Sequence, residues 1–574
     1  MSFWKVLNID LTNNTSEITP LSPEWKYLGG RAFTSQIVSD LVPADCNPVG
    51  KKNILVIATG LLAGSGASSS YRVSIGAKSP LTGGIKESNS GGRAGFSLSM
   101  LGLRGIIIKG ISPAWQIMII DKKGVRFDPA GYLVGQNIFS TTEILRKQYG
   151  DKSSVIVIGT AGEYLLKAAC IGLTDNEGVP ARHAGRGGLG AVMGSKHLKA
   201  IIIDESGGSL PQPFDQKVIK SFCRVFSKEL LNHPVTNFAL PRFGTAVMVD
   251  TINAVGGLPT RNYSQGQFEG ASRIDGQALY DLIATRNGKP THSCMPGCVV
   301  RCSNIILDRK GNELNRALEY ETIGLLGSNC GIDDLDTINT LNRVCDDIGL
   351  DTIEIGAAIG VAMEAGVITF GDGEKMFTLF DEIKKFSPLG RILGNGALIT
   401  GKEFKVARIP VVKGQAMAAY DPRALKGIGV TYATSPMGAD HTAGNVLPGA
   451  KLPDGTLVDT TSAEHQVELS RFTQLMATIF DMLGLCWFTK PPIFEDISII
   501  SNILSAYCGE NWDEDRLMKI AKQTIATEIA FNRAAGFTEE DDDLPEFFRK
   551  ESLDPNKFLF DVEKQALLEV HKDL

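Results

Sequence analysis

Short apolar, β-branched runs dominate the first third of the chain. Five of them, each bounded by Gly, Pro, Asp or Lys, predict β-strands; they span residues 54–58, 105–109, 116–120, 154–158 and 200–204. Glycine clusters separate the runs and mark turns. The Ser-, Gly- and Pro-rich stretch 206–213 follows the last run. We therefore predict a β-rich domain over residues 1–207.

Apolar residues recur at helical spacing after this stretch. The predicted helices span 214–231, 333–348, 352–365, 375–386 and 464–482. The last 60 residues are also predicted to be helical, with a solvated acidic turn at 539–543. A boundary near 405–412 divides this part into 208–410 and 411–574. The sequence thus predicts an α+β protein, in which a β-rich base domain precedes two mainly α-helical domains.

Composition narrows the classes of function. The 62 glycines among 574 residues are about 11%, against roughly 7% in average proteins, which suits tight turns and backbone packed against a ligand. A net charge of −6 without a polybasic run disfavours general nucleic-acid or membrane-surface binding. No uncharged apolar run reaches about 18 residues, so no membrane span is expected. Because the N-terminus lacks the pattern of a signal peptide, we expect a cytoplasmic protein.

Three of the ten cysteines lie within nine residues, at Cys294, Cys298 and Cys302. Pro296-Gly297 prevents a regular helix there, so the backbone can wrap around a bound group. In a chain without secretory features, this clustering favours a metal or iron–sulfur site over disulfides. A cubane cluster needs four thiolates, which requires a fourth cysteine elsewhere. A structural zinc site that adds His292 to the three cysteines is the alternative.

Two segments share the pattern Asp-x-x-Gly-Leu-(Asp/Cys). They are Asp346 to Gly349-Leu350-Asp351 and Asp481 to Gly484-Leu485-Cys486. In each segment the glycine is predicted to end a helix. An acidic side chain at a helix C-terminus opposes the helix dipole, so each aspartate is expected to have a specific donor partner. Two copies indicate two similar ligands or two halves of one ligand.

The stretch from Ala184 to Gly190 combines glycines with Arg186 and suits a phosphate, through exposed N–H groups and the guanidinium. A dinucleotide-binding fingerprint needs a preceding strand. The preceding residues 174–183 are polar. We therefore reject a dinucleotide-binding fold.

Taken together and in order, these features resemble the aldehyde:ferredoxin oxidoreductase family of tungsten–pterin enzymes over nearly the whole chain. The motifs that carry the resemblance, besides the cysteine stretch and both Asp motifs, are Tyr27-Leu-Gly-Gly-Arg31, Ser79-Pro-Leu-Thr-Gly83, Asn89-Ser-Gly-Gly92, Gly159-Thr-Ala-Gly-Glu163, Ala184 to Lys196, Glu319-Tyr-Glu-Thr322, Tyr420-Asp-Pro-Arg423 and Gly438-Ala-Asp-His441. The chain departs from the family at its cysteines, where the family often has Cys-x-x-Cys and this chain has Cys294-x-x-x-Cys298.

The resemblance implies a tungsten bis-pterin cofactor, one [4Fe–4S] cluster and Mg²⁺. Cys486 would join the three clustered cysteines as cluster ligand, and Asp346 and Asp481 would each accept hydrogen bonds from one pterin. Backbone carbonyls of Asn89 and His183 would hold Mg²⁺, which prefers oxygen ligands. The further residues expected to contact the pterins and their phosphates are Arg72, Gly91, Gly92, Arg182, Ala184, Gly185, Arg186, Gly187, Gly188, Gly349, Leu350, Asp351, Gly484 and Leu485.

The resemblance also implies oxidation of an aldehyde to the carboxylic acid, with electrons leaving through the cluster to ferredoxin or an iron–sulfur partner subunit. Glu319 or Glu321 would take a proton and His441 would donate to the developing oxyanion. If this segment is extended, both glutamates point the same way, and the sequence does not say which is the base.

A low-potential reductase resembling the tungsten subunit of class II benzoyl-CoA reductases is the alternative function. The sequence leaves open which aldehyde is used, whether the metal is tungsten or molybdenum, and the physiological direction. It also leaves open whether the protein forms a homo-oligomer or a hetero-oligomer.

Overall fold

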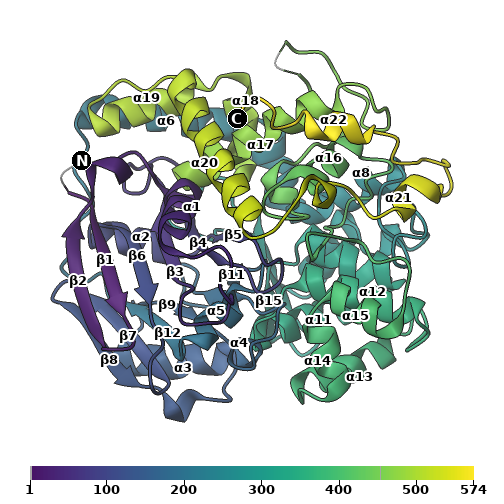
Figure 1. Ribbon diagram of the computed structural model, residues 1–574, viewed down its shortest axis with the longest axis horizontal. Helices are drawn as coiled ribbons and strands as arrows, with labels where there is room; N and C mark the ends of the chain where they lie inside the picture. The colour runs from purple at the N-terminus through teal and green to yellow at the C-terminus, as the bar shows by residue number, and fades with distance from the viewer. Residues whose placement is uncertain (1–2, 453) are drawn as a thin grey trace.

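Two six-stranded sheets form the N-terminal part of the computed structural model, which describes residues 3–452 and 454–574. Both sheets lie on one side of the molecule, and helices of the later chain lie beside and above them (Figure 1). In the first sheet the strands run in the order β2 (Thr15–Pro20), β1 (Lys5–Asp10), β6 (Leu103–Lys109), β3 (Leu55–Thr59), β4 (Val73–Lys78) and β5 (Ile85–Ser90). Helices α1 (Gly30–Leu41) and α2 (Ala94–Met100) belong to this half.

The second sheet repeats the topology of the first. Its order is β8 (Gly124–Pro129), β7 (Gln116–Asp121), β12 (Leu198–Ile203), β9 (Ser154–Val157), β10 (Ile171–Leu173) and β11 (Arg182–Ala184). In each half a hairpin comes first, the last strand returns parallel to the first strand, and the other pairs are antiparallel. The helices of this half are α3 (Ile138–Tyr149), α4 (Thr160–Glu163) and α5 (Leu189–Ser195). Strands β1 to β12 thus form two structural repeats.

The two repeats meet along their edge strands β5 and β11, which pack against each other. Apolar residues of both sheets share one buried core, to which β3 contributes Ile57 and β9 contributes Ile156. Asn89 lies on β5 and His183 on β11, at equivalent places in the two repeats. The pairing of β5 with β11 therefore brings equivalent residues of the two repeats to one central region.

The predicted helices are confirmed, with ends shifted by about two residues. They are α6 (Gln216–Asn232), α11 (Leu335–Ile348), α12 (Thr352–Glu364), α13 (Gly373–Lys384) and α17 (Gln466–Leu483). Further helices are α7 (Leu240–Phe243), α8 (Met248–Ala254), α9 (Gly276–Thr285), α14 (Pro388–Gly394), α15 (Ala397–Phe404), α16 (Lys426–Thr434), α18 (Lys490–Glu495), α19 (Ser498–Cys508) and α20 (Glu514–Ala534). The α+β fold class is confirmed.

One feature of the helical part was not predicted, and the expectation of a helical tail was wrong. A three-stranded sheet of β13 (Lys289–His292), β14 (Ser303–Leu307) and β15 (Glu313–Arg316) lies within it, with the cysteine stretch between β13 and β14. After α20 the chain is mostly irregular, with only short helices such as α21 (Phe547–Lys550) and α22 (Lys564–Leu568). Phe548 and Val570 are nevertheless fully buried. Packing of single side chains against the body thus holds this tail without long helices.

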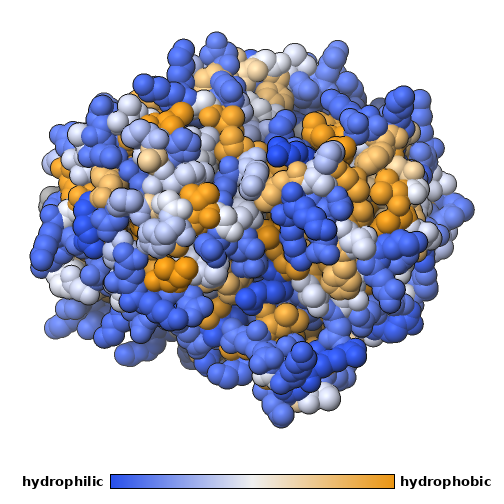
Figure 2. Space-filling view, turned by 90° about the horizontal axis from the view of Figure 1, so that it is seen from below, coloured by the Kyte–Doolittle hydropathy of each residue, from blue (hydrophilic) through white to orange (hydrophobic). Residues whose placement is uncertain are grey.

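The surface carries both polar and apolar residues. Seen from below, hydrophilic side chains surround this face and apolar side chains show between them (Figure 2). Among the described residues, no single helix is long and apolar enough to cross a membrane; α17 and the segment Trp487–Glu495 pass that test only as a pair bent by 112°.

Candidate cofactor and metal site

The second Asp motif is fixed against the first sheet by backbone contacts. Helix α17 ends at Gly484, whose φ of +71° is left-handed. The Gly484 carbonyl accepts a hydrogen bond of 3.1 Å from the Arg72 N–H. A Cβ on Gly60 would lie 2.1 Å from the Gly484 nitrogen, and a Cβ on Gly30 would lie 1.9 Å from the Asp481 carbonyl oxygen. Glycine at these two positions therefore allows the close approach of the motif.

The Asp481 carboxylate meets donors from β5 and α1. Its Oδ1 accepts from Asn89 Nδ2 at 2.9 Å, and its Oδ2 lies 3.6 Å from Arg31 Nη1. Arg72 in turn donates to Asn89 Oδ1 at 2.5 Å. Burial, reinforced by the negative charge of Glu87, raises the pKa of Asp481 well above its usual value. The side chain keeps 15% of its surface exposed, which leaves room for a further donor from a ligand.

The first Asp motif is held against the second sheet in the same way. Helix α11 ends at Gly349, with φ of +81°, and its carbonyl accepts from the Cys170 N–H at 2.9 Å. A Cβ on Gly159 would lie 2.3 Å from the Ile348 carbonyl oxygen. The Asp351 N–H donates to the Ala168 carbonyl at 3.0 Å. Each Asp motif thus contacts the corresponding loops of its own repeat.

Asp346 lies beside His183 as Asp481 lies beside Asn89. His183 Nδ1 is 3.5 Å from Asp346 Oδ1, and Asn342 donates to Oδ2 at 3.1 Å. Burial raises the pKa of Asp346, against the lowering effect of the nearby His183 and Arg182. The Nε2 atom of His183 is buried and has no hydrogen-bond partner among the described residues. The equivalent strands β5 and β11 thus each supply one residue to one aspartate.

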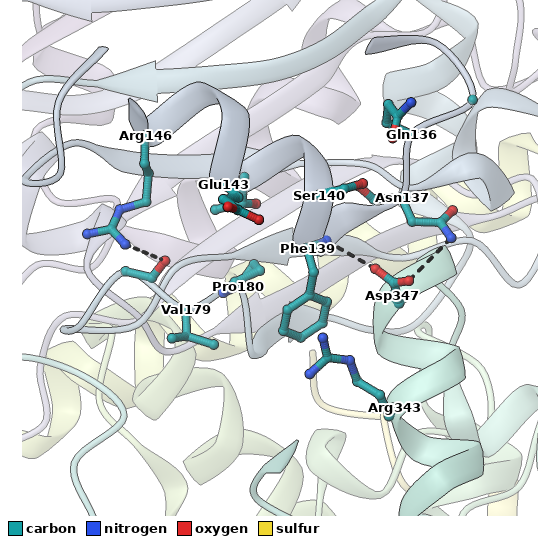
Figure 3. Close-up of a pocket in the computed structure, with 13 residues that line it drawn as sticks. Gln136, Asn137, Phe139, Ser140, Glu143, Arg146, Val179, Pro180, Arg343 and Asp347 are labelled. Atoms are coloured by element: carbon teal, nitrogen blue, oxygen red, sulfur yellow. Dashed lines mark hydrogen bonds between the residues drawn. The ribbon is translucent and has the colours of Figure 1, made fainter. Parts of the chain in front are cut away.

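Asp347, at the acidic C-terminal end of α11, contacts the start of α3. Its carboxylate accepts from the Phe139 N–H at 3.1 Å and from Asn137 Nδ2 at 3.3 Å (Figure 3). Both donors lie at the start of α3, where a negative charge is favourable. The Arg343 guanidinium stands 3.4 Å from the centre of the Phe139 ring, at a cleft of about 560 Å³ that these residues line. Asp347 therefore ties the end of α11 to the second repeat, next to Asp346.

The glycine-rich loop presents backbone rather than side chains. No atom lies within 4 Å of a Cβ built on Gly185, so this position faces open space. Gly187 approaches the Lys86 side chain, and Gly188, with φ of +74°, precedes α5. Ala184 is buried at the end of β11. N–H groups at the start of a helix suit an anion.

The two arginines near this loop, Arg182 and Arg186, differ in how fully the protein satisfies their hydrogen-bond donors. Arg186 donates to Asp351 at 3.2 Å and to the Ala439 and Ala416 carbonyls, each at 2.6 Å. Its guanidinium therefore ties parts of the protein together. Arg182 bonds the Arg316 carbonyl, but its Nε is buried without a partner in the described chain. Arg182 keeps donor capacity for a ligand.

The four cysteines named in the sequence gather at one place. The Cys294 and Cys298 thiols share a hydrogen bond, which lowers the pKa of Cys298 to about 6. Burial and then the nearby Cys486 charge raise the pKa of Cys302. The Cys486 N–H donates to the Ser69 carbonyl at 2.9 Å, directly after the second Asp motif. Four thiols from two distant segments are the donor set of a [4Fe–4S] cluster.

Glycines of the first repeat border the cysteines. A Cβ on Gly91 would lie 3.3 Å from Cys294 Sγ, and one on Gly92 would lie 2.7 Å from the Thr174 carbonyl oxygen. Gly297, with φ of +72°, lets the chain turn between Cys294 and Cys298. Pro296 and Gly297 form a turn within the longer spacing between these cysteines.

The histidine of the zinc alternative contacts an aspartate. His292 Nε2 lies 3.3 Å from Asp175 Oδ2. Within residues 3–452 and 454–574, no three His, Cys, Asp or Glu side chains are placed to hold a single metal ion.

Glu321 and His441 face each other, whereas Glu319 lies apart. Glu321 Oε1 is 3.2 Å from His441 Nε2, and Glu321 Oε2 accepts from the Ala419 N–H at 2.8 Å. Glu319 is exposed and accepts from Thr245 Oγ1 at 2.6 Å. The segment is not extended, because helix α10 (Tyr320–Thr322) begins directly after Glu319. Helical geometry turns the two side chains in different directions.

Other polar groups complete this part of the site. Tyr420 shares a hydrogen bond with Glu321, and burial raises the pKa of Tyr420 well above its usual value. His441 Nδ1 is buried without a hydrogen-bond partner among described residues. Lys86 Nζ binds Asp440 Oδ2 at 2.5 Å and so anchors the His441 loop to β5.

Sequence reasoning missed Lys86, Asp440 and Glu87. Glu87 lies two residues before Asn89 on β5, and burial raises its pKa beside Arg31 and Asp481. Strand alternation would have placed Glu87 and Asn89 on one face. β5 itself carried no apolar run that predicted a strand.

Two family profiles cover most of the chain. Residues 6–205 match "Aldehyde ferredoxin oxidoreductase, N-terminal domain", and residues 221–570 match "Aldehyde ferredoxin oxidoreductase, domains 2 & 3". The chain belongs to the aldehyde ferredoxin oxidoreductase family. This confirms the resemblance drawn from the motifs and makes the chain a member of an oxidoreductase family with tungsten-containing relatives.

Members of this family resemble the chain along its length. The tungsten-containing aldehyde ferredoxin oxidoreductase of Pyrococcus horikoshii is 32% identical over 97% of this chain and 93% of that protein. The corresponding protein of Pyrococcus furiosus is 31% identical over 93% and 89%. The WOR-like subunit of an aliphatic sulfonate oxidoreductase from Pyrococcus furiosus is 29% identical over 95% and 89%.

A solved structure shares the fold. The active site complex BamBC of benzoyl coenzyme A reductase, in complex with 1,5-dienoyl-CoA, superposes with a TM-score of 0.83. The alignment covers 99% of this chain and 93% of that chain, at 20% identity.

Proposed function

We propose that the protein holds a tungsten bis-pterin cofactor beside one [4Fe–4S] cluster and oxidises an aldehyde to its carboxylic acid. Electrons leave through the cluster to ferredoxin or an iron–sulfur partner subunit. The observation that carries the proposal is the convergence of both Asp motifs and four cysteines on the central strands of two repeats. Relatives at 31–32% identity are named for aldehyde and tungsten, which supports the choice of substrate class.

The residues around the two aspartates fit the pterins. Asp481 and Asp346 would each accept from one pterin ring, because a carboxylate takes two parallel N–H donors from an aminopyrimidine edge. The unpartnered Nε of Arg182 and the open backbone at Gly185 would meet phosphates. Carbonyls of Asn89 and His183, equivalent in the two repeats, would hold Mg²⁺ between the phosphates. The remaining backbone contacts would come from Gly91, Gly92, Ala184, Gly187, Gly188, Gly349, Leu350, Asp351, Gly484 and Leu485.

Cys294, Cys298, Cys302 and Cys486 would hold the cluster. Because Cys486 follows Gly484-Leu485, one short segment would contact both the second pterin and the cluster. That arrangement keeps the two redox groups close, as electron transfer requires. The hydrogen bond between the Cys294 and Cys298 thiols lowers the pKa of Cys298 and raises the pKa of Cys294, so each thiol would lose its proton on binding the cluster.

When bound, the tungsten cofactor supplies a two-electron redox centre. Residues of the chain itself would transfer the protons. Glu321 Oε1 and His441 Nε2 lie within hydrogen-bond distance, at 3.2 Å. When the ring carries both protons, Nδ1–H donates to the oxygen that develops negative charge, while Nε2–H stays on Glu321. Glu321 is therefore our candidate base, and Glu319, bound to Thr245, is not.

The low-potential reductase remains the second candidate for this chain. The benzoyl coenzyme A reductase complex is only 20% identical to this chain, so the similarity shows a shared fold and no shared activity. No contact among the described residues favours a coenzyme A ester over an aldehyde, so we propose aldehyde oxidation.

Anaerobic turnover in ¹⁸O-labelled water tests this proposal. The purified holoenzyme is given a panel of aliphatic and aromatic aldehydes with benzyl viologen as acceptor. We expect two viologens reduced per acid formed and at least one ¹⁸O in each carboxylate, since an aldehyde also exchanges its carbonyl oxygen with water through its hydrate. Absence of aldehyde-dependent reduction, together with reoxidation of reduced viologen by an aromatic coenzyme A ester, would favour the reductase.

A further inference from the structure

We propose that the surface over the cysteine stretch is the docking site of a small acidic iron–sulfur protein. This electron-exit face consists of the exposed residues of α6, of the π-helix Val235–Ala239 and of the loop 296–301. The proposal rests on the proposed function, since it locates the partner that takes the electrons. Each aldehyde oxidised with water releases two electrons and two protons, so two one-electron [4Fe–4S] acceptors are reduced per turnover.

The elements of this face pack on both segments that carry the cysteines. Helix α6 packs against α18, which begins at Lys490 shortly after Cys486. Helix α7 packs against β13, which leads into Cys294, and Thr291 Oγ1 donates to the Pro241 carbonyl at 2.9 Å. The face therefore covers the site of all four thiols from outside.

Apolar side chains stand open on this face. Four of them line α6 and the segment that follows it: Val225 is 49% exposed, Leu231 46%, Val235 43% and Phe238 57%. The Arg242 guanidinium lies 5.6 Å from the Phe238 ring centre. An exposed apolar cluster rimmed by charge is typical of a protein–protein contact.

The charge of the face selects the partner. Residues 215–245 contain five cationic side chains, Lys217, Lys220, Arg224, Lys228 and Arg242, against two carboxylates, Asp215 and Glu229. The four cations on α6 form no ion pair within the described chain. Arg301 in the cysteine loop is also exposed. A positive face on a chain of net charge −6 attracts an acidic protein.

A second copy of the chain fits this face poorly. A twofold contact through it would set the same cations opposite each other, and like charges across an interface cost free energy. An acidic electron-transfer protein instead pairs with them and brings its own cluster close to the four cysteines. Weak, transient redox contacts need only a small interface.

Charge reversal on α6 tests the docking site. The variant Lys220→Glu/Arg224→Glu is compared in the anaerobic holoenzyme with Lys385→Glu/Lys402→Glu, which changes net charge equally on distant helices. With a small acidic [4Fe–4S] ferredoxin as acceptor at low salt, we expect the α6 pair to raise KM about tenfold. The control pair should change KM less than about twofold. Turnover with benzyl viologen should be equal in all three proteins.

Ferredoxin binding to the holoprotein, measured by calorimetry at several salt concentrations, gives a readout that needs no turnover. Salt-dependent binding that the α6 pair weakens supports the docking site, even if no aldehyde is oxidised and the proposed function fails. Equal binding by both charge-reversal variants overturns it. A homodimer that Phe238→Ser dissociates overturns it as well, because a second copy would then occupy the face.

Discussion

In the proposed function, single residues divide the site into a part that transfers protons and a part that transfers electrons. Glu321, His441 and Tyr420 share hydrogen-bonding contacts at one end, and the four cysteines gather at the other. The aspartates Asp346 and Asp481, at the ends of α11 and α17, lie against His183 and Asn89 on the strands where the repeats meet. Substitutions should therefore separate turnover from cofactor content.

Exchange of the two glutamates tests the proton assignment. Glu321→Gln should lower kcat about 100-fold or more, the usual contribution of a general base, because the amide cannot take the proton. Glu319→Gln should stay within a few-fold of the wild type, since Glu319 binds Thr245 instead of His441. Both variants should keep full tungsten and iron content. An inactive Glu319→Gln beside an active Glu321→Gln would reverse the assignment.

Cys486→Ser tests the fourth cluster ligand. Its iron content should fall below that of the wild type and its cluster absorbance should weaken, because a thiolate is lost. Cys508→Ser, which changes a half-buried cysteine at the end of α19, should keep both. If Cys486→Ser retains a stable full cluster, another residue is the fourth ligand.

At the scale of helices and strands, the two Asp motifs could be recognised from the sequence, whereas the strands that contact them could not. The helices before Gly349 and Gly484 follow from apolar periodicity and a glycine stop. The expectation that each aspartate has a donor partner is met by Asn89 and His183. Those partners come from β5 and β11, which are too polar or too short to be recognised as strands.

Gly60→Ala tests the close packing of the second Asp motif on β3. Its Cβ would lie 2.1 Å from the Gly484 nitrogen, so the end of α17 must move. We expect a loss of about 1–3 kcal/mol of stability, as for other overpacked sites, together with lower tungsten content. Gly131→Ala, where no atom lies within 4 Å, is the control and should change neither. Unchanged denaturation and metal content in Gly60→Ala would contradict the contact.

Glu354 on α12 should give the fold a pH dependence. Burial raises its pKa to about 7 from 4.5, and it accepts from the Ala397 and Ala416 N–H groups. Between these values the folded chain holds a proton that the unfolded chain releases, so unfolding free energy falls as pH rises from about 4.5 to 7. The largest loss is about 3 kcal/mol at 1.36 kcal/mol per pKa unit.

Denaturation midpoints at pH 5 and pH 7 measure this effect. Glu354→Gln should lose stability less steeply than the wild type over this range, because the amide does not titrate. Glu403→Gln, at an exposed carboxylate on α15, should follow the wild type. Parallel curves for Glu354→Gln and the wild type would show that Glu354 ionises normally in the folded protein.

At the scale of the whole molecule, the sequence predicted the β-then-α order and the family but not the repeat. The two halves share topology without sharing residues, since Asn89 stands where the other half has His183, and Arg72 stands where it has Cys170. Spacing along the chain also could not tell Glu321 from Glu319, because that distinction depends on a helix that begins between them. The small sheet around the cysteines could not be predicted, because its strands are short.

We propose that the two repeats and the helices over them enclose one tungsten bis-pterin beside one [4Fe–4S] cluster. Metal and labile-sulfide analysis of protein purified without oxygen tests it most directly. We predict one tungsten or molybdenum, about four iron and four sulfide per chain, with Mg²⁺ present. Zinc without iron or sulfide would contradict the account.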